Sequence, residues 1–280
     1  MCYGICMIQD IAPHILDNVY SPRPPRDEDF VLVCRDGQVL LNVETKEIKL
    51  PQYRHFKGES LLFLFTLDGM GFYLHTGEVE ELEGFTYVNI RLPLNEFKPK
   101  HLVFAVLTGL HLATWYDSNR FCGKCASQME HSTTERALLC PKCGLTKYPQ
   151  ISPVVIVGIT NGDNLLLTKY ASGYDRYALV AGFAEIGETL EETVKREILE
   201  EVGLKVRNIR YYKSQPWAFS QSLLMGFFAD ICDDTTVEVD KNELSEATWF
   251  HRSQIPKDDT GAMSLTWNMI EAFRANIHPI

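Results

Sequence analysis

The stretch GFAEIGETLEETVKREILEEVGL, residues 182–204, decides how the rest of this chain is interpreted. It passes from a glycine-containing loop into a run that is typical of a helix. We expect the helix to open at Glu188 or Thr189 and to run to about Val202. Gly203 follows at the place where glycine commonly ends a helix, so the stretch predicts a loop followed by one helix.

Three carboxylates crowd one face of this helix. Glu197, Glu200 and Glu201 are separated by the three- and four-residue steps that share a face, where like charges repel. Arg196 can pair with Glu200, but one cation does not offset three anions. Hard divalent cations prefer carboxylate oxygens, and Mg²⁺ is typically bound by carboxylates together with substrate phosphates. The face therefore predicts a Mg²⁺ or Mn²⁺ site, and the competing interpretation of the helix alone is a solvated acidic surface.

As a whole, the stretch resembles the Nudix box at every defined position. Gly182 is followed after five residues by Glu188, and after seven more by the run REILEEVGL, Arg196–Leu204. The resemblance implies a hydrolase that cleaves a nucleoside diphosphate linked to another moiety, built on an α/β/α sandwich. Ala181, just before the box, would offer a backbone carbonyl to the same metals. We expect Glu201 to be the residue most needed, as ligand or base, and which glutamate is the base stays open because the family varies in it. The implied metal-binding and catalytic residues are Glu197, Glu200 and Glu201, and the implied shape-holding residues are Arg196 and Glu188.

Four of the eight cysteines form two Cys-x-x-Cys pairs separated by fourteen residues. Each pair can present two thiolates to one ion, and two pairs complete a closed tetrahedral site, which is structural rather than catalytic. Four unrelated thiols or a redox pair are the alternatives. The predicted zinc ligands are Cys122, Cys125, Cys140 and Cys143, whereas Cys2, Cys6, Cys34 and Cys232 show no pairing pattern.

Downstream of the box lies SQPWAFSQSLLMGF, residues 214–227. It resembles the SQPW signature of the NADH pyrophosphatase subfamily, whose members also carry a four-cysteine zinc site before the Nudix domain. The subfamily more often has proline where this chain has Ala218 and Ser220. Taken alone, Trp217 and Phe219 favour core packing over ligand binding. The segment implied to contact substrate comprises Gln215, Pro216, Trp217, Ala218, Phe219, Ser220, Gln221 and Ser222.

The subfamily resemblance implies hydrolysis of NADH or NAD⁺ to nicotinamide mononucleotide and AMP, and removal of an NAD cap from RNA. Phe183 and Tyr148 would flank a nucleotide ring, with Tyr148 reaching across a homodimer. Glu135 matches a substrate-contacting position, and Thr266 lies where relatives have a small residue at the substrate. Glu243 matches a further metal ligand from outside the box, and its alternative interpretation is a surface glutamate before a strand.

Residues 1–116 predict a β-rich domain of unclear role. Apolar runs around Asp36-Gly37 and around Asp68-Gly69 are strong hairpin signals, and TYVNIRLPL is a further strand candidate. The long apolar run His101–Tyr116 lacks proline and predicts a helix. No catalytic constellation stands out in this part of the chain.

Residues 117–150 predict a small four-cysteine zinc ribbon, and residues 151–280 a Nudix hydrolase domain. PVVIVGIT and NLLLTKYA read as strands around an NGD turn, and SLTWNMIEAFRANI has the spacing of a closing amphipathic helix. The predicted class is α+β, with a Nudix α/β/α sandwich behind the ribbon and the β-rich domain.

The formal net charge of -10 argues against a general nucleic-acid binder. No apolar run is long enough to span a bilayer, so we expect no membrane partner. The N-terminus does not resemble a signal peptide, and we expect a reducing, cytoplasmic compartment. The substrate preference between free NAD(H) and NAD-capped RNA stays open, as does a non-catalytic nucleotide sensor, although such sensors typically lose box glutamates.

Overall fold

The structure, a computed structural model, describes residues 7–44, 46–91, 95–173, 176–232, 236–257 and 263–279. The chain divides into two compact units. One comprises Ile8–Gln150, and the other comprises Ile151–Ile280 together with Met1–Met7. Cys2 and Cys6, and part of the TYVNIRLPL segment, lie outside the described residues.

The C-terminal unit is built on one mixed sheet with the strand order β13-β14-β10-β11-β15, and β12 pairs with β10 beside this path. Strand β10 runs parallel to β14 and antiparallel to β11 and β12. The NGD turn joins β10 to β11, as the sequence predicts. The strand bounds are β10 Ser152–Asn161, β11 Asn164–Tyr170, β12 Val180–Phe183, β13 Val206–Trp217, β14 Ser222–Ile231 and β15 Leu244–His251.

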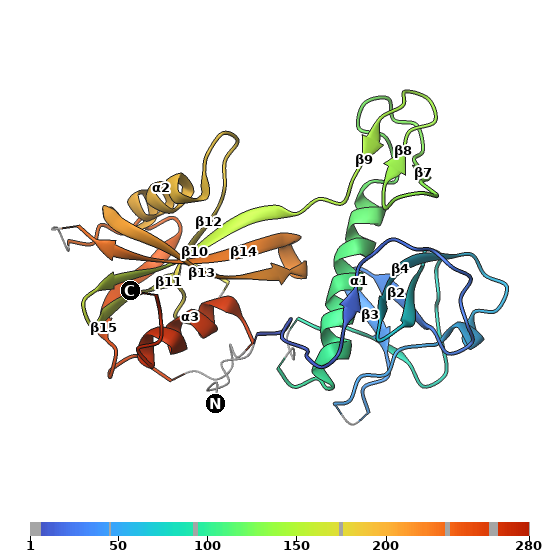
Figure 1. The fold of residues 1–280 in the computed structure, drawn as a ribbon, viewed down its shortest axis with the longest axis horizontal. Coiled ribbons are helices and arrows are strands. Elements are labelled where there is room, and N and C mark those ends of the chain that lie inside the picture. The colour runs from blue at the N-terminus through green and yellow to red at the C-terminus, as the bar shows by residue number, and fades with distance from the viewer. Residues whose placement is uncertain are drawn as a thin grey trace. The chain divides into compact units, whose positions relative to one another are not determined.

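Helices cover both faces of this sheet, α2 (Leu190–Val202) on one side and α3 (Leu265–Arg274) on the other (Figure 1). Alternate residues of a strand point to opposite faces, and the buried residues of β10 divide in this way. Val154 and Ile156 pack with Leu265, Met269 and Phe273 of α3, and Met7 joins the same core. Val155, Val157 and Ile159 pack with Val194, Ile198 and Val202 of α2. The predicted α/β/α sandwich is confirmed.

Helix α2 begins and ends as its sequence predicts. The Thr189 hydroxyl accepts a hydrogen bond from the Glu192 backbone N–H at 3.2 Å, and the Glu192 carboxylate accepts one from the Thr189 backbone N–H at 2.7 Å. This reciprocal pair satisfies two donors that the first turn otherwise leaves free. Gly203 closes the helix in the left-handed conformation, with φ 71°, which glycine adopts at little cost.

The N-terminal unit holds a six-stranded sheet with the order β1-β4-β5-β2-β3-β6. Both predicted hairpins are present, and Asp36, Gly37, Asp68 and Gly69 all have positive φ, as a two-residue hairpin turn requires. The strand bounds are β1 Leu16–Asp17, β2 Phe30–Arg35, β3 Gln38–Leu41, β4 Leu61–Leu67, β5 Met70–His75 and β6 Thr86–Val88, with a short 3₁₀ turn at Tyr53–His55.

Helix α1, Lys100–Ser118, confirms the predicted apolar helix and packs against β2, β4 and β5. A Cβ atom at Gly109 would lie 2.6 Å from the Leu32 side chain, so this glycine lets the helix approach the sheet closely. The chain then forms the small sheet β7 (Glu130–His131), β8 (Leu138–Leu139) and β9 (Thr146–Lys147) around the cysteine pairs.

Candidate active site and zinc centre

Arg196 organises the glutamates of α2. Its guanidinium donates to the Glu188 carboxylate at 2.6 and 2.9 Å, to Glu197 at 2.7 Å and to Glu200 at 2.9 Å. It also donates to the carbonyl of Phe183 at 2.9 Å, which ties the end of β12 to the helix. Arg196 thus has more carboxylate partners than Glu200, the one that its spacing predicts. The hydrogen bonds from the Arg196 guanidinium lower the pKa of Glu188 to about 2. The loop and the helix form one ion-paired unit.

Gly182 makes room for Glu197. A Cβ atom at this position would lie 1.9 Å from the carboxyl carbon of Glu197 and 2.0 and 2.3 Å from its oxygens. The backbone of β12 therefore forms a wall against which the carboxylate rests. Any residue other than glycine would displace Glu197 from this place.

Glu201 is the buried member of the cluster, with an exposed fraction of 3%. Its Oε2 atom has no hydrogen-bond partner among the residues that the structure describes, and a backbone hydrogen bond from Ala181 reaches the same carboxylate. Burial raises the pKa of Glu201 to about 8, and the charges of Glu243, Glu197 and Asp240 act in the same direction. A buried, partly unsatisfied carboxylate among like charges is costly unless a cation joins it. The donor set therefore fits a hard divalent cation.

Glu243 lies in the turn before β15, where it is exposed and its charge raises the pKa of both Glu201 and Glu197. Its backbone is fixed on both sides, because Ala171 N–H donates to the Glu243 carbonyl at 2.8 Å and Glu243 N–H donates to the Asp240 carbonyl at 3.2 Å. In the described ranges, no carboxylates gather as tightly as the four cysteine sulfurs do. Arg196 bonds Glu188, Glu197 and Glu200, whereas Glu201 is buried.

Gln215 anchors the beginning of α3. It is fully buried, its Oε1 accepts from the Leu265 backbone N–H at 2.7 Å, and its Nε2 donates to the Met263 carbonyl at 2.8 Å. The protein itself thus satisfies both ends of the amide. Thr266 is half-buried in the first turn of α3, directly after Leu265, whose backbone N–H Gln215 holds.

Of the remaining signature residues, some pack into the core and others are exposed to solvent. Trp217 packs against the core on the α3 side, and its ring meets that of Phe219 edge to face at 5.2 Å. Ser222 is buried and donates to the Ser220 carbonyl at 2.9 Å. The 3₁₀ turn Ala218–Ser220 ends at Gln221, which has a left-handed φ of 50°. Pro216 and Ser220 are exposed, and Ala218, Phe219 and Gln221 are half-buried.

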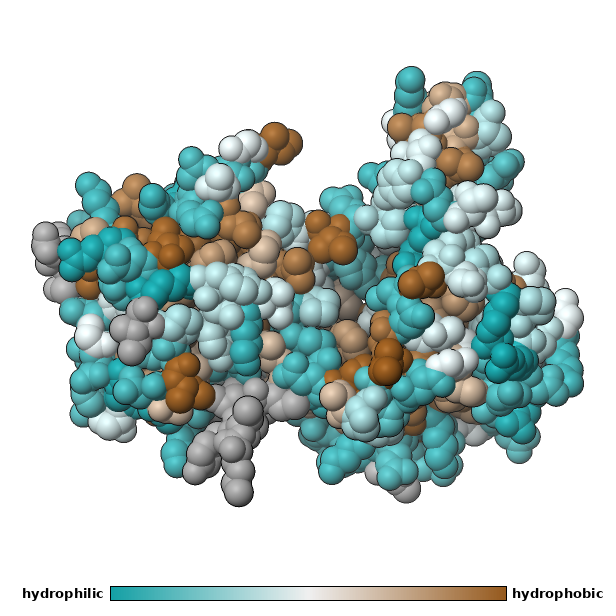
Figure 2. Space-filling model, viewed as in Figure 1, coloured by the Kyte–Doolittle hydropathy of each residue, from teal (hydrophilic) through white to brown (hydrophobic). Residues whose placement is uncertain are grey.

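The two predicted ring-stacking residues are both accessible. Phe183, at the end of β12, has an exposed fraction of 53%, and Tyr148 has one of 56%. They belong to different units, and Tyr148 donates through its hydroxyl to the Glu135 carboxylate at 3.1 Å. This bond raises the pKa of the Tyr148 phenol. Beyond Phe183, the loop from β12 to α2 carries the fully exposed Ile186, and hydrophobic surface appears at its tip (Figure 2).

The four predicted zinc ligands converge. The sulfurs of Cys122 and Cys143 lie 3.6 Å apart, those of Cys125 and Cys140 lie 3.4 Å apart, and all four lie within 4.8 Å of one another. A tetrahedral zinc with bonds of about 2.3 Å would place its sulfurs about 3.8 Å apart, so the spacing fits zinc. All four are free thiols rather than disulfides. The chain therefore has a four-cysteine zinc ribbon.

The two cysteine pairs share one backbone geometry. Ala126 N–H donates to the Cys122 carbonyl at 2.8 Å, and Gly144 N–H donates to the Cys140 carbonyl at 3.0 Å. Ala126 and Gly144 both have positive φ, which turns each chain back after its second cysteine. Each pair therefore presents its two sulfurs to the shared centre in a similar way.

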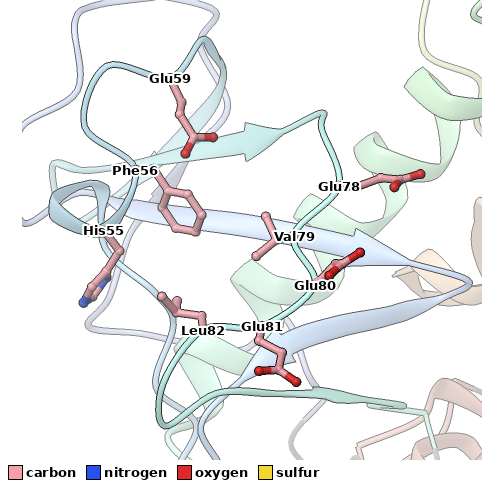
Figure 3. Close-up of a pocket in the computed structure, with 8 residues that line it drawn as sticks. All are labelled: His55, Phe56, Glu59, Glu78, Val79, Glu80, Glu81 and Leu82. Carbon is pink, nitrogen blue, oxygen red and sulfur yellow. The ribbon is translucent and has the colours of Figure 1, made fainter.

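The N-terminal unit has a cavity of about 470 Å³ that lies outside the predicted site. Figure 3 shows Glu59, Glu78, Glu80 and Glu81 around the apolar side chains of its lining. An acidic lining repels phosphate esters. This cavity is therefore no candidate for the dinucleotide.

Two features of the candidate site escaped sequence reasoning. Asp240 raises the pKa of Glu201, and its carbonyl accepts from the Leu244 N–H at 2.9 Å at the start of β15. The anchoring role of Gln215 was likewise missed. No local pattern predicts that Asp240 lies near Glu201 or that Gln215 holds the beginning of α3, because the two partners in each case are distant in the chain.

Two family matches cover the C-terminal part of the chain. The NUDIX domain matches residues 150–271, and the NADH pyrophosphatase zinc ribbon domain matches residues 117–148. No helix in the described ranges is both long and apolar enough to cross a membrane.

Similar proteins include the NAD-capped RNA hydrolase NudC of Photorhabdus laumondii, which is 46% identical over 149 residues, 53% of this chain and 58% of that protein. The NAD-capped RNA hydrolase NudC of Erwinia tasmaniensis is 45% identical over 151 residues, 53% of this chain and 57% of that protein. The chain thus spans less than two thirds of the length of either relative. A solved NUDIX hydrolase from Nitrosomonas europaea has a TM-score of 0.44 at 25% identity, covering 49% of this chain and 80% of that one. The glutamate helix, the four-cysteine centre and the two family matches together show that this chain carries a NUDIX domain at residues 150–271, preceded by an NADH pyrophosphatase zinc ribbon domain at residues 117–148.

Proposed function

We propose that this chain is a metal-dependent hydrolase that splits the pyrophosphate of NADH or NAD⁺ into nicotinamide mononucleotide and AMP. The observation that carries the proposal is Glu201, a buried carboxylate among like charges, one oxygen of which has no hydrogen-bond partner in the described ranges. The complete set of box glutamates and the names of the two curated relatives support the same conclusion.

The residues proposed to hold Mg²⁺ or Mn²⁺ are Glu197, Glu200 and Glu201, with Glu243 and the backbone carbonyl of Ala181. A bound divalent cation neutralises the pyrophosphate charge and lowers the pKa of a water molecule. Arg196 fixes the carboxylates of Glu197 and Glu200 through bonds of 2.7 and 2.9 Å. Burial and neighbouring charges raise the pKa of metal-free Glu201, and a bound cation would offset this cost of its charge, with Glu201 serving as ligand or base.

Recognition of the dinucleotide is proposed to use two exposed aromatic rings. Phe183 and Tyr148 offer faces on which a nucleotide ring stacks, and Tyr148 would act across a homodimer. Glu135 bonds Tyr148 and supplies a carboxylate acceptor. Thr266 and the segment from Gln215 to Ser222 complete the proposed contacts, with Gln215 acting through the beginning of α3.

NAD-capped RNA is the second candidate substrate, because both curated relatives carry that activity in their names. The net charge of -10 counts against strong binding of a long polyanion. Rates on NADH and on a short NAD-capped RNA, measured at equal concentrations and at two salt concentrations, decide between them. A salt-insensitive preference for NADH supports the dinucleotide, and a salt-sensitive preference for the RNA supports decapping.

A non-catalytic nucleotide sensor is the competing proposal. The decisive experiment incubates the purified chain with NADH and Mn²⁺ and quantifies nicotinamide mononucleotide and AMP. Equal amounts of the two products, abolished by chelation and strongly reduced in Glu201→Gln, support hydrolysis. Nucleotide binding without products would instead support the sensor.

The three-part division of the chain is part of this proposal. Residues 151–280 would carry the chemistry, residues 117–150 would hold the structural zinc, and residues 1–116 would form the β-rich N-terminal domain. A cytoplasmic location is proposed with it, because cysteines that are not joined in disulfides suit a reducing compartment.

A further inference from the structure

Arg136 lies in the turn between β7 and β8 of the ribbon, yet its side chain reaches the N-terminal sheet. Its Nη2 atom donates to the Asn18 carbonyl at 3.2 Å and to the Leu64 carbonyl in β4. The guanidinium also lies 5.6 Å from the centre of the Tyr20 ring. Among the described residues these contacts are to carbonyls and a ring, with no carboxylate, and its buried Nε has no partner.

Half-burying the Arg136 guanidinium without a carboxylate partner in the described ranges costs desolvation free energy that an apolar side chain would not incur. Burial lowers the pKa of Arg136, which reflects the cost of desolvating its charge. Apolar side chains of similar size often stabilise a buried position as well or better. The contacts of Arg136 are directional, however, and they fix the turn relative to two specific carbonyls.

A second residue of the N-terminal sheet region holds the same turn. The Tyr20 hydroxyl donates to the Ser132 carbonyl at 3.2 Å. The buried hydroxyl of Ser132 then accepts from the backbone N–H groups of Thr134 and Glu135, both at 3.3 Å. The backbone around Glu135 is thus fixed on both sides, by Tyr20 through Ser132 and by Arg136 directly.

Glu135 is the residue that this turn presents. It is exposed, and its carboxylate accepts from the Tyr148 hydroxyl at 3.1 Å. We propose that Arg136 and Tyr20 are positioning residues that hold Glu135 against Tyr148, so that the N-terminal domain contributes to dinucleotide recognition through this turn. The inference rests on the proposed function, in which Glu135 and Tyr148 contact the substrate, and it assigns residues 1–116 a definite task.

The test compares Arg136→Met with Arg120→Met in the zinc-loaded, full-length protein. Methionine keeps much of the side-chain length and removes the donors, and Arg120 is a ribbon arginine whose side chain is 70% exposed. Arg136→Met should raise KM for NADH about tenfold with kcat changed less than about twofold, since hydrogen bonds to a charged group are at stake. Arg120→Met should change neither. Arg136→Lys should recover part of the loss, and Tyr20→Phe should give a smaller KM increase of about threefold.

A double-mutant cycle separates positioning from general stability. If Arg136 acts through Glu135, Arg136→Met should have little further effect on KM when Glu135 is already alanine. Equal effects in both backgrounds, or an unchanged KM in Arg136→Met and Tyr20→Phe, would overturn the inference while leaving the hydrolase proposal intact. An unchanged KM in Glu135→Ala would overturn it as well. A wild-type protein that yields no products would instead refute the proposed function.

Discussion

Gly182→Ala tests whether the wall beside Glu197 belongs to the chemistry or to the fold. The new Cβ would lie 1.9 Å from the Glu197 carboxyl carbon, and ordinary contact begins at 3.4 Å, so the carboxylate must move by about 1.5 Å. A misplacement of about 1 Å in a catalytic constellation can cost roughly 10²-fold. We therefore expect kcat/KM for NADH to fall about 10²-fold at saturating Mn²⁺.

The fold should tolerate the same change. The atom that must move is the end of a flexible side chain, and Gly182 does not have the positive φ that disfavours alanine. Weakening the Arg196–Glu197 pair costs about 0.2–1 kcal/mol. Replacing glycine by alanine at a compatible backbone recovers about 0.4–1 kcal/mol. The free energy of unfolding, measured in urea without metal, should therefore stay within about 1 kcal/mol of the wild type.

Gly158→Ala is the matched control in the same sheet. Its Cβ would lie 2.6 Å from the Phe228 ring in the core, where nothing flexible can yield. Overpacking of this kind costs about 1–3 kcal/mol, so this variant should lose stability and keep its activity per folded molecule. A Gly182→Ala enzyme that hydrolyses NADH at a rate within about twofold of the wild type would refute the metal role of Glu197.

Three further predictions concern charge, zinc and stacking. In the metal-free protein, burial raises the pKa of Glu201 from an ordinary value of 4.5 to about 8. The contribution of Glu201 to the free energy of unfolding is therefore fully present below about pH 4.5 and is lost as the pH rises through about 8. Urea unfolding should therefore show the wild type losing roughly 2 kcal/mol more than Glu201→Gln between about pH 6 and pH 9, and parallel curves would contradict the burial argument. Cys140→Ser should release the single zinc, detected by metal analysis, and destabilise the fold more than it alters the chemistry; a folded, zinc-loaded variant would rule this out. Phe183→Ala should reduce kcat/KM for NADH about 10–100-fold with metal affinity unchanged, because the half-exposed ring would lose both its stacking and the apolar area buried against the nucleotide. A small diphosphate ester lacking one ring is the comparison substrate, and equal losses on both would make Phe183 a packing residue.

The local backbone conformation of several segments is determined by residues that are close in the sequence. Thr189 and Gly203 set the ends of α2, since capping and a left-handed C-terminus depend on residues within one turn. The Asp-Gly pairs fix their hairpins for a similar reason. The two cysteine pairs repeat one short backbone geometry, so their spacing predicts a zinc centre before any tertiary contact is known.

The exposure and the partners of the glutamates depend on tertiary packing. Glu197, Glu200 and Glu201 are equivalent acids in the sequence, but one rests on Gly182, one pairs with Arg196 at the surface, and one is buried. The signature residue Gln215 became an anchor for α3, which no spacing indicates. Burial and electrostatic fields sum over segments that are distant in the chain. For that reason the sequence alone predicts which residue types the box carries, whereas only the tertiary structure assigns each carboxylate its own exposure, partners and pKa.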